Sequence, residues 1–242
     1  MHIYKKPVAL VTGGAKGLGR SISLYLAKKG YLVVINYLNS EKEANETLDQ
    51  VKKFSSESIS ICADVTDEKQ VSKMFETIDR EFGRLDVLIN NVGNFIYKPI
   101  PQTSVSEFNE VISNNLSSVF ICSKYAIELM KKNKFGRIIS FGSCGADRML
   151  VRKFTTPYYI SKTGVLLLTK ALSSEVAPFG ITVNAISPGI LESSVIKHKS
   201  PSGRDAKFDD IINAVDFLLK AESDYVNGAN IEVAGGLVFG RE

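Results

Sequence analysis

The chain has 242 residues, of which 44% are hydrophobic and 23% are charged, and its formal net charge is +4. This composition is typical of a globular protein with a large core, and it excludes a disordered chain. The positive charge is mild and spread along the sequence, which excludes the clustered basic surface of a nucleic-acid-binding protein. No apolar run is long enough to span a bilayer, and the first residues do not resemble a secretory signal, so we expect a soluble cytoplasmic protein.

Short apolar runs alternate with longer segments of helical periodicity along the whole chain. The apolar runs predict seven strands, at 7–12, 31–36, 58–63, 85–90, 136–142, 181–187 and 230–233. The periodic segments predict helices at 17–29, 40–54, 67–82, 106–132 and 207–220, with a further helix around Tyr158 and Lys162. Such alternation requires crossover connections, which build a parallel sheet with helices on both faces. We therefore predict a single doubly wound α/β domain of the Rossmann type over residues 1–242.

Two helix ends carry a recognisable signal in the sequence. Ser40 is the expected N-cap of the second helix, and Glu43 stands where it completes a capping box. Gly83 follows the third helix, where a glycine ends a helix in the left-handed conformation.

The segment between the first strand and the first helix is rich in glycine. It has the spacing Gly13-x-x-x-Gly17-x-Gly19. Glycines at this position allow a pyrophosphate to approach the N-terminus of a helix, where free N–H groups and the helix dipole favour an anion. A tight turn without a ligand is the alternative, but the position directly after the first strand favours a dinucleotide site. The predicted binding residues of this loop are Gly13, Ala15, Lys16, Gly17, Leu18 and Gly19.

The charges near this loop indicate which dinucleotide binds. An NAD site usually places a carboxylate at the end of the second strand, on the ribose hydroxyls. Asn36 and Tyr37 occupy that position here, and the next carboxylate is Glu41. Lys16 lies within the loop, where its ammonium could meet a 2′-phosphate, and a solvated surface lysine is the alternative. The sequence therefore favours NADP over NAD, with Asn36 and Tyr37 at the binding site.

Tyr158 and Lys162 are four residues apart and so share one face of a helix. A phenol has an ordinary pKa of about 10, and a cation beside it favours the phenolate. The pair could thus transfer a proton near neutral pH. Such a pair also arises by chance on solvated helices, so the spacing alone decides nothing.

Several motifs in order along the chain resemble those of the short-chain dehydrogenase/reductase family. They are Thr12-Gly13-x-x-x-Gly17-x-Gly19, Asp64-Val65, Asn90-Asn91-Val92-Gly93, Asn115, Ser143, Tyr158 with Lys162, and Pro188-Gly189. The stretches 114–120, 136–139 and 180–184 are most similar to those of 3-oxoacyl-[acyl-carrier-protein] reductases. The resemblance covers nearly the whole chain.

The resemblance implies a role for each matching residue. Tyr158 would donate a proton to a carbonyl oxygen, Ser143 would hydrogen-bond that oxygen, and Lys162 would lower the pKa of Tyr158. Asn115 would position a water that relays protons. The resemblance further implies cofactor contacts from Asp64, Val65, Asn91, Gly93, Tyr158, Lys162, Pro188, Gly189 and Ile190. It also implies an NADPH-dependent enzyme of fatty acid biosynthesis.

Some assignments have rivals in the sequence. Asn114 could replace Asn115 in a different helix register, and Tyr159 is a second tyrosine near Lys162, although we interpret it as a packing aromatic. Cys144 has no resolving cysteine, so we interpret it as a small loop or pocket residue. The only histidines, His2 and His198, cannot form a histidine-based triad or a histidine-rich metal site, and we predict no bound metal.

The substrate depends on segments where the chain departs from the family pattern. The expected substrate lid, at about 190–206, is short, and Ser193 stands where a threonine often follows the Pro-Gly motif. Arg148, Arg152 and Lys153 could attract an acidic carrier protein or coenzyme A, or could be solvated loop charges. We predict a reductase of 3-oxoacyl thioesters presented on acyl-carrier protein or coenzyme A.

Two other functions stay open. One is reduction of other small ketones, such as sugar, steroid or xenobiotic carbonyls, which the short lid allows. The other is a non-catalytic NADP-binding sensor or assembly protein. The family resemblance also implies a homodimer or homotetramer built through the long helices and the C-terminal strand, and the apolar tail 235–239 would suit such an interface.

Overall fold

The computed structural model describes residues 6–149, 153–194 and 200–237. Some residues singled out in the sequence lie outside this part of the chain: His2, Arg152, His198, the middle of the lid at 195–199, and the tail from 238 onward.

Seven parallel strands form one sheet in the order β3-β2-β1-β4-β5-β6-β7. Their bounds are β1 Val8–Val11, β2 Leu32–Tyr37, β3 Ile59–Cys62, β4 Val87–Asn90, β5 Gly136–Phe141, β6 Ile181–Pro188 and β7 Asn230–Val233. The predicted seven-stranded parallel sheet is confirmed. The strand order reverses between β1 and β4, and in sheets of this kind ligands bind at the carboxyl ends of the strands beside such a reversal.

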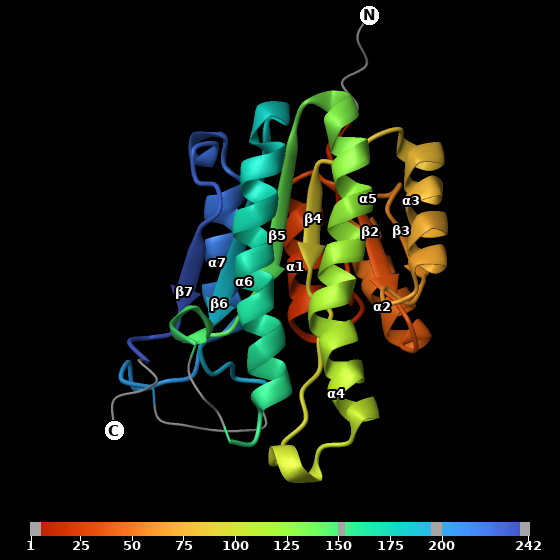
Figure 1. Ribbon diagram of the computed structural model, residues 1–242. Helices are drawn as coiled ribbons and strands as arrows, with labels where there is room; N and C mark the ends of the chain where they lie inside the picture. Colours follow the sequence, from red (N-terminus) through yellow and green to blue (C-terminus); the bar gives the residue numbers. More distant parts are fainter. Residues whose placement is uncertain (1–5, 150–152, 195–199, 238–242) are drawn as a thin grey trace, which may run out of the picture.

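Helices cover both faces of the sheet (Figure 1). The long helices are α1 Gly17–Lys28, α2 Glu41–Lys52, α3 Glu68–Phe82, α4 Val105–Ile112, α5 Ser118–Asn133, α6 Thr156–Val176 and α7 Phe208–Leu219. Short helical turns lie at Ile100–Gln102, Ala146–Arg148, Ala177–Phe179 and Ala221–Ser223. Helices α3, α5 and α6 pack on one face, and α1, α2 and α7 pack on the other.

The strands are apolar on both sides because each face of the sheet has its own hydrophobic core. In β1, all four residues of Val8–Val11 are buried, with alternate side chains in the two cores. Helix α3 places Val71, Met74 and Ile78 on the face that meets the sheet, with the spacing of helical turns. A nearly continuous apolar strand between helices of this kind is what a doubly covered parallel sheet requires.

The helix ends follow the sequence signals only in part. Gly83 ends α3 with a positive φ of 66°, as predicted. The carboxylate of Asp67 caps the start of α3, accepting hydrogen bonds from the N–H groups of Lys69 and Gln70. The predicted capping box at Ser40 is wrong, because Ser40 precedes α2 but its side chain makes no capping hydrogen bond.

The predicted helix 106–132 is divided into three pieces. Helix α4 passes into one π-helical segment, Ser113–Ser117, and then into α5. The wider turn of a π segment changes which residues face the sheet, and such segments often occur at functional sites. Asn115 lies within it and is fully buried.

Candidate active site

A cavity of about 280 Å³ opens at the carboxyl ends of β4, β5 and β6. It is lined by Leu18, Asn91, Gly93, Asn94, Phe95, Asn115, Phe141, Gly142, Ser143, Tyr158, Lys162, Pro188, Gly189, Leu191 and Ser194. All four residues proposed as catalytic from the sequence lie here, although they come from segments far apart in the chain. The strand order places this cavity beside the reversal between β1 and β4.

Helix α6 carries Tyr158 and Lys162 on one face, one turn apart, as their spacing predicts. The Tyr158 phenol is hydrogen-bonded to the Ser143 hydroxyl. The Lys162 ammonium lies 5.5 Å from the centroid of the Tyr158 ring. It donates a hydrogen bond of 2.8 Å to the carbonyl of Phe141, at the end of β5. The hydroxyl, the phenol and the ammonium therefore form one cluster at the cavity wall.

Asn115 completes this cluster from the π-helical segment. Its Nδ2 donates to the carbonyls of Asn94 at 2.7 Å and Val111 at 2.9 Å, which fixes the side chain. Its Oδ1 is buried without a hydrogen-bond partner in the part of the chain that the structure describes. A Cβ on Gly93 would lie 2.4 Å from this oxygen and 3.6 Å from the Lys162 Nζ. Asn115, and not its rival Asn114, thus contributes its side chain to the cavity.

Burial dominates the pKa values of the tyrosine and the lysine. Desolvation raises the pKa of Tyr158 to about 12, Tyr159 adds to the rise, and the hydrogen bond with Ser143 opposes it. Desolvation also lowers the pKa of Lys162 to about 8. We expected Lys162 to lower the pKa of Tyr158. This expectation is wrong for the protein chain by itself, in which the pKa of Tyr158 is raised. The physical reason is that the ammonium donates to Phe141, while the phenol loses its hydration.

The glycine loop has the shape that a dinucleotide requires. Gly13 and Gly17 have positive φ values of 60° and 54°, and the space beside a Cβ on Gly17 is open. A Cβ on Gly19 would lie 2.2 Å from the carbonyl oxygen of Gly13, so the loop packs too closely for any side chain there. No side chain caps the start of α1 at Lys16. The first N–H groups of this helix can therefore meet a pyrophosphate, and the residues present fit the cofactor.

The residues at the end of β2 differ from the expectation in one respect. Asn36 is buried, its Nδ2 donates to the Ala63 carbonyl at 2.9 Å, and its Oδ1 accepts from the Gly13 N–H at 3.4 Å. Its side chain therefore holds the glycine loop and does not face a ribose. Tyr37 is half-buried at the end of the strand, and Lys16 is exposed, with no carboxylate partner among the described residues.

The other residues predicted to contact the cofactor lie around the same edge of the sheet. Asn91 ties β4 to the glycine loop, donating from Nδ2 to the carbonyls of Thr12 at 3.1 Å and Gly13 at 3.2 Å. The Asp64 carboxylate accepts from the N–H of Thr66, and Val65 beside it is buried. Pro188 and Gly189, two further residues predicted to contact the cofactor, line the cavity. Ala15 is buried, and Ile190 lines a neighbouring cavity of about 160 Å³.

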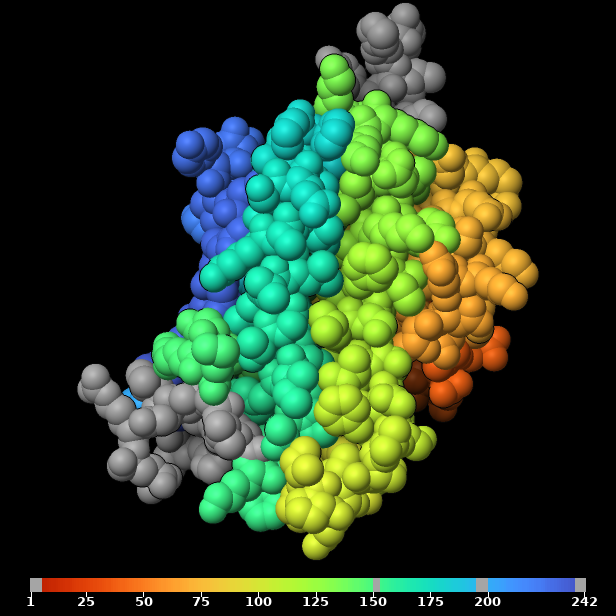
Figure 2. All heavy atoms as spheres, in the orientation of Figure 1, coloured from red at the N-terminus to blue at the C-terminus, as the bar shows by residue number. Residues whose placement is uncertain are grey.

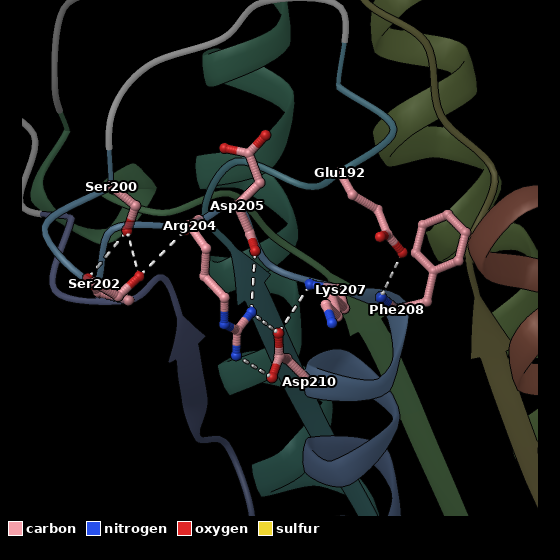
Figure 3. A network of polar contacts seen from close by, with 9 residues as sticks. Glu192, Ser200, Ser202, Arg204, Asp205, Lys207, Phe208 and Asp210 are labelled. Atoms are coloured by element: carbon pink, nitrogen blue, oxygen red, sulfur yellow. Dashed lines mark hydrogen bonds and ion pairs between the residues drawn. The ribbon is translucent and has the colours of Figure 1, made fainter.

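The described ends of the lid are fixed to each other and to α7 (Figure 3). Leu191 and Ala206 form a bridge, and the Glu192 N–H donates to the Ala206 carbonyl at 2.8 Å. Arg204 donates to both carboxylate oxygens of Asp210, at 2.6 and 2.9 Å. This pairing holds the pKa of Asp210 at about 2. The short lid is thus anchored on both sides, which places Leu191 and Ser194 at the cavity.

The loop between β5 and α6 carries the cations that could attract an acidic partner. Arg148 is paired with the carboxylate of Glu232 at 2.8 Å, so its charge is already balanced. Lys153 is exposed. The Cys144 thiol is buried and donates to the Leu237 carbonyl, and burial raises its pKa to about 11. Tyr159 packs against a small apolar cluster behind the cavity, in agreement with its interpretation as a packing aromatic.

The sequence analysis did not single out six residues that line the cavity: Asn94, Phe95, Phe141, Gly142, Leu191 and Ser194. Asn94 and Phe95 directly follow the Asn-Asn-Val-Gly motif, so their position after β4 was a usable signal. Leu191 and Ser194 lie in the lid, where only the folded structure shows which side chains turn inward.

The family model of the short chain dehydrogenases matches residues 7–204 of the chain. The chain belongs to the short-chain dehydrogenase/reductase family. It is 35% identical to the 3-oxoacyl-[acyl-carrier-protein] reductase FabG of Staphylococcus aureus, over 95% of this chain and 97% of that protein. It is also 35% identical to a protein of Bacillus subtilis named "Putative oxidoreductase YtkK", over 95% of each chain.

Among solved structures, the chain resembles "a putative gluconate dehydrogenase" from Agrobacterium tumefaciens, with a TM-score of 0.89, 30% identity and 95% coverage of both chains. Membership of the short-chain dehydrogenase/reductase family makes the protein an oxidoreductase of CH–OH and C=O groups that uses a nicotinamide cofactor. Of the helices in the described part of the chain, none has the length and apolar character needed to cross a membrane.

Proposed function

We propose that the protein is an NADPH-dependent carbonyl reductase that converts 3-oxoacyl thioesters into 3-hydroxyacyl products. The observation that carries this proposal is the cluster of Ser143, Tyr158, Lys162 and Asn115 at one cavity wall. The choice of a 3-oxoacyl thioester is supported by the reductase of Staphylococcus aureus, which the chain matches over nearly its whole length. The substrate would be presented on acyl-carrier protein or on coenzyme A.

Each side chain of the cluster has a task in this reaction. When bound, the reduced nicotinamide supplies a hydride to the carbonyl carbon. Tyr158 gives its phenolic proton to the carbonyl oxygen, and Ser143 donates a hydrogen bond to the same oxygen. The Lys162 ammonium stabilises the negative charge that develops on Tyr158 as its proton leaves. The unpaired Oδ1 of Asn115 can accept a hydrogen bond from a water that returns a proton towards Lys162.

The pKa values favour the reductive direction. A phenol with the ordinary pKa of about 10 carries its proton at neutral pH, and the raised pKa of Tyr158, about 12, keeps it protonated to higher pH. A proton donor must be protonated before the reaction, whereas oxidation of an alcohol needs the phenolate as base. The ground state of this site is therefore prepared for ketone reduction.

The preference for NADPH rests on the charges around the adenine end of the cofactor site. Lys16 is exposed beside the start of α1 and has no carboxylate partner among the described residues. The end of β2 carries no acidic residue that would repel a 2′-phosphate. Lys16 can therefore pair with that phosphate, and we propose Tyr37 as a neighbouring contact.

Reduction of another small ketone is the second candidate function. Two solved structures that the chain resembles are described as "a putative gluconate dehydrogenase" and "a putative short-chain alcohol dehydrogenase". A non-catalytic NADP-binding protein is a weaker candidate, because all four residues of the cluster are present and assembled.

Consumption of NADPH tests the proposal directly. We expect turnover of acetoacetyl-coenzyme A to exceed that of simple ketones, and NADPH to be preferred over NADH. Tyr158→Phe should lower turnover by roughly 10²-fold to 10⁴-fold, the usual contribution of a general acid, while NADPH binding persists. The matched control is Tyr159→Phe on the same helix, which should retain turnover. Undiminished turnover in Tyr158→Phe would contradict its role as proton donor.

The domain boundaries, the location in the cell and the oligomeric state stay predictions. We propose one domain over 1–242 with a lid at 190–206, a cytoplasmic location, and a homodimer or homotetramer. The oligomer is supported by large apolar side chains that are exposed on α4, α5 and α6, which lie next to one another on one face of the molecule (Figure 2). They are Val105, Phe120, Ile160 and Leu167.

A further inference from the structure

Three exposed aromatic side chains, Phe95, Tyr97 and Phe154, lie in the loop after β4 and the loop before α6, and we call them the aromatic rim. Phe95 lines the cavity, and its ring meets the Tyr158 ring edge-on, with centroids 6.1 Å apart. Tyr97 and Phe154 stack on each other with centroids 4.9 Å apart and an angle of 21° between their planes. Tyr97 follows Phe95 by two residues, in the same loop after β4.

The aromatic rim presents apolar surface to solvent. Phe95 is 43% exposed, Tyr97 is 59% exposed and Phe154 is 42% exposed. A contiguous group of exposed aromatic side chains is a common mark of a binding surface, because each ring left in water forgoes the free energy of burial. Here the exposed rings adjoin the proposed proton donor.

The aromatic rim is also held in place before any substrate arrives. The Lys98 N–H donates to the Phe154 carbonyl at 2.8 Å, which joins the loop after β4 to the loop before α6. The Lys98 ammonium is paired with Glu107 at 2.5 Å, and Glu107 forms a capping box with Ser104 at the start of α4. Rings held in this way bind a partner without losing further conformational freedom.

Two polar side chains at the same cavity make hydrogen bonds within the protein. Asn94 donates from Nδ2 to Glu110 at 2.9 Å, and the Ser194 hydroxyl accepts from the N–H of Leu191 at 3.0 Å. Among the described residues that line the cavity, Lys162 alone is charged, and it donates to Phe141. The described lining of the cavity therefore lacks a second cation that could pair with an anionic group such as a sugar carboxylate.

We propose that the aromatic rim binds the non-reacting part of the substrate, and that this part is an uncharged alkyl chain or aryl ring. The carbonyl would lie at Tyr158 and Ser143, and the apolar part would extend past Phe95 onto the stacked rings. This inference rests on the proposed function for the position of the carbonyl, but it does not require a thioester. It makes Phe95 and Tyr97 residues that determine specificity.

Two homologous series of substrates test this inference and the thioester proposal separately. The first series is 3-oxoacyl-coenzyme A with four, six and eight carbons, and the second is the ethyl 3-oxo esters of the same lengths. In both series kcat/KM should rise by roughly twofold to fourfold for each added methylene, which is the effect of removing it partly or fully from water. In Phe95→Ala and Tyr97→Ala this rise should largely disappear. Phe54→Ala, at an aromatic residue 52% exposed elsewhere on the molecule, should keep it.

The outcomes distinguish the two ideas. Esters that show the rise while thioesters are not reduced would refute the thioester proposal and support the aromatic rim. A flat dependence on chain length in the natural protein, or an undiminished rise in both rim variants, would overturn the inference. If neither series is reduced, thermal unfolding is measured with NADPH and alkyl phenyl ketones of increasing chain length. A ligand-induced rise in Tm that does not grow with chain length would also overturn the inference. If the rim variants dissociate in light scattering but keep the rise of kcat/KM with chain length, the rings belong to a subunit contact and the inference is overturned.

Discussion

At the scale of single residues, the chemistry of the site depends on two ionisable groups that lie together at the cavity wall. The Tyr158 phenol and the Lys162 ammonium both lose hydration, so the tyrosine holds its proton more tightly and the lysine holds its proton less tightly. The ordinary pKa values of the two groups are nearly equal, and burial moves them apart, to about 12 for Tyr158 and about 8 for Lys162. The lysine therefore becomes the group that titrates first as the pH rises.

This order predicts how the rate of reduction depends on pH. Below about pH 8 both groups carry their protons, so kcat/KM should be constant. Above that value Lys162 loses its charge and no longer stabilises the developing phenolate, so kcat/KM should fall, while Tyr158 stays protonated. Steady-state rates of NADPH consumption between about pH 6 and pH 10 measure the profile. Lys162→Arg keeps its charge throughout because the guanidinium pKa exceeds 12. Its rate should be lower but should not fall near pH 8, and a constant rate in the natural protein up to pH 10 would contradict the assignment.

At the scale of elements, the ends of two helices show why a sequence signal is not yet a contact. Asp67 caps α3 through its side chain, whereas Ser40 has the same position before α2 and makes no capping bond. The backbone of Ser40 has φ −102° and ψ 57°, away from the extended conformation that directs an N-cap side chain towards the helix. Residue type and spacing alone cannot predict which of the two side chains caps its helix, because the preceding loop sets the backbone angles.

The two caps form a matched pair for a stability measurement. Asp67→Ala should lower the free energy of unfolding by about 1 kcal/mol, because two N–H groups of α3 lose their acceptor. That change corresponds to a fall in Tm of about 2–4 °C for a chain of this size. Ser40→Ala should change it by no more than a few tenths of a kcal/mol. Equal losses in chemical or thermal unfolding of both variants would show that the capping bond is not the cause.

The π-helical segment between α4 and α5 is a second feature of this scale. The apolar spacing of 106–132 predicts one uninterrupted helix, and no residue type in this segment indicates a π-helical turn. The segment Ser113–Ser117 nevertheless places Asn115 towards Gly93 and Lys162. The family resemblance selected Asn115, which lines the cavity, while the periodicity alone could not choose between Asn114 and Asn115.

At the scale of the whole molecule, the architecture was predictable because it depends on pattern and not on detail. Each buried strand is a nearly continuous apolar run, and the crossover connections then predict a parallel sheet with helices on both faces. The pKa of Tyr158 was not predictable in the same way. It depends on packing by Phe95 and Tyr159, and on Lys162 turning to Phe141, which join segments far apart in the chain. The role of Asn36 was not predictable either, because its side chain makes hydrogen bonds to the Gly13 N–H and the Ala63 carbonyl.

The surface of the whole molecule leads to a prediction about assembly. Helices α5 and α6 run side by side over one face of the sheet (Figures 1 and 2), and they expose Phe120 at 51% and Leu167 at 69%. Large apolar side chains grouped in this way favour burial against another copy of the chain. Leu167→Glu and Phe120→Glu place a charge that would lose its hydration in such an interface, so each should shift the oligomer towards monomer.

Light scattering coupled to gel filtration measures this shift. Phe54→Glu is the matched control, because Phe54 is 52% exposed and follows α2 on the opposite face of the sheet. It should leave the mass unchanged. Circular dichroism of all three variants tests that each is folded, since a charge on an exposed helix face costs the monomer little. If the folded variants at Leu167 and Phe120 keep the mass of the natural protein, the face of α5 and α6 does not hold the subunits together.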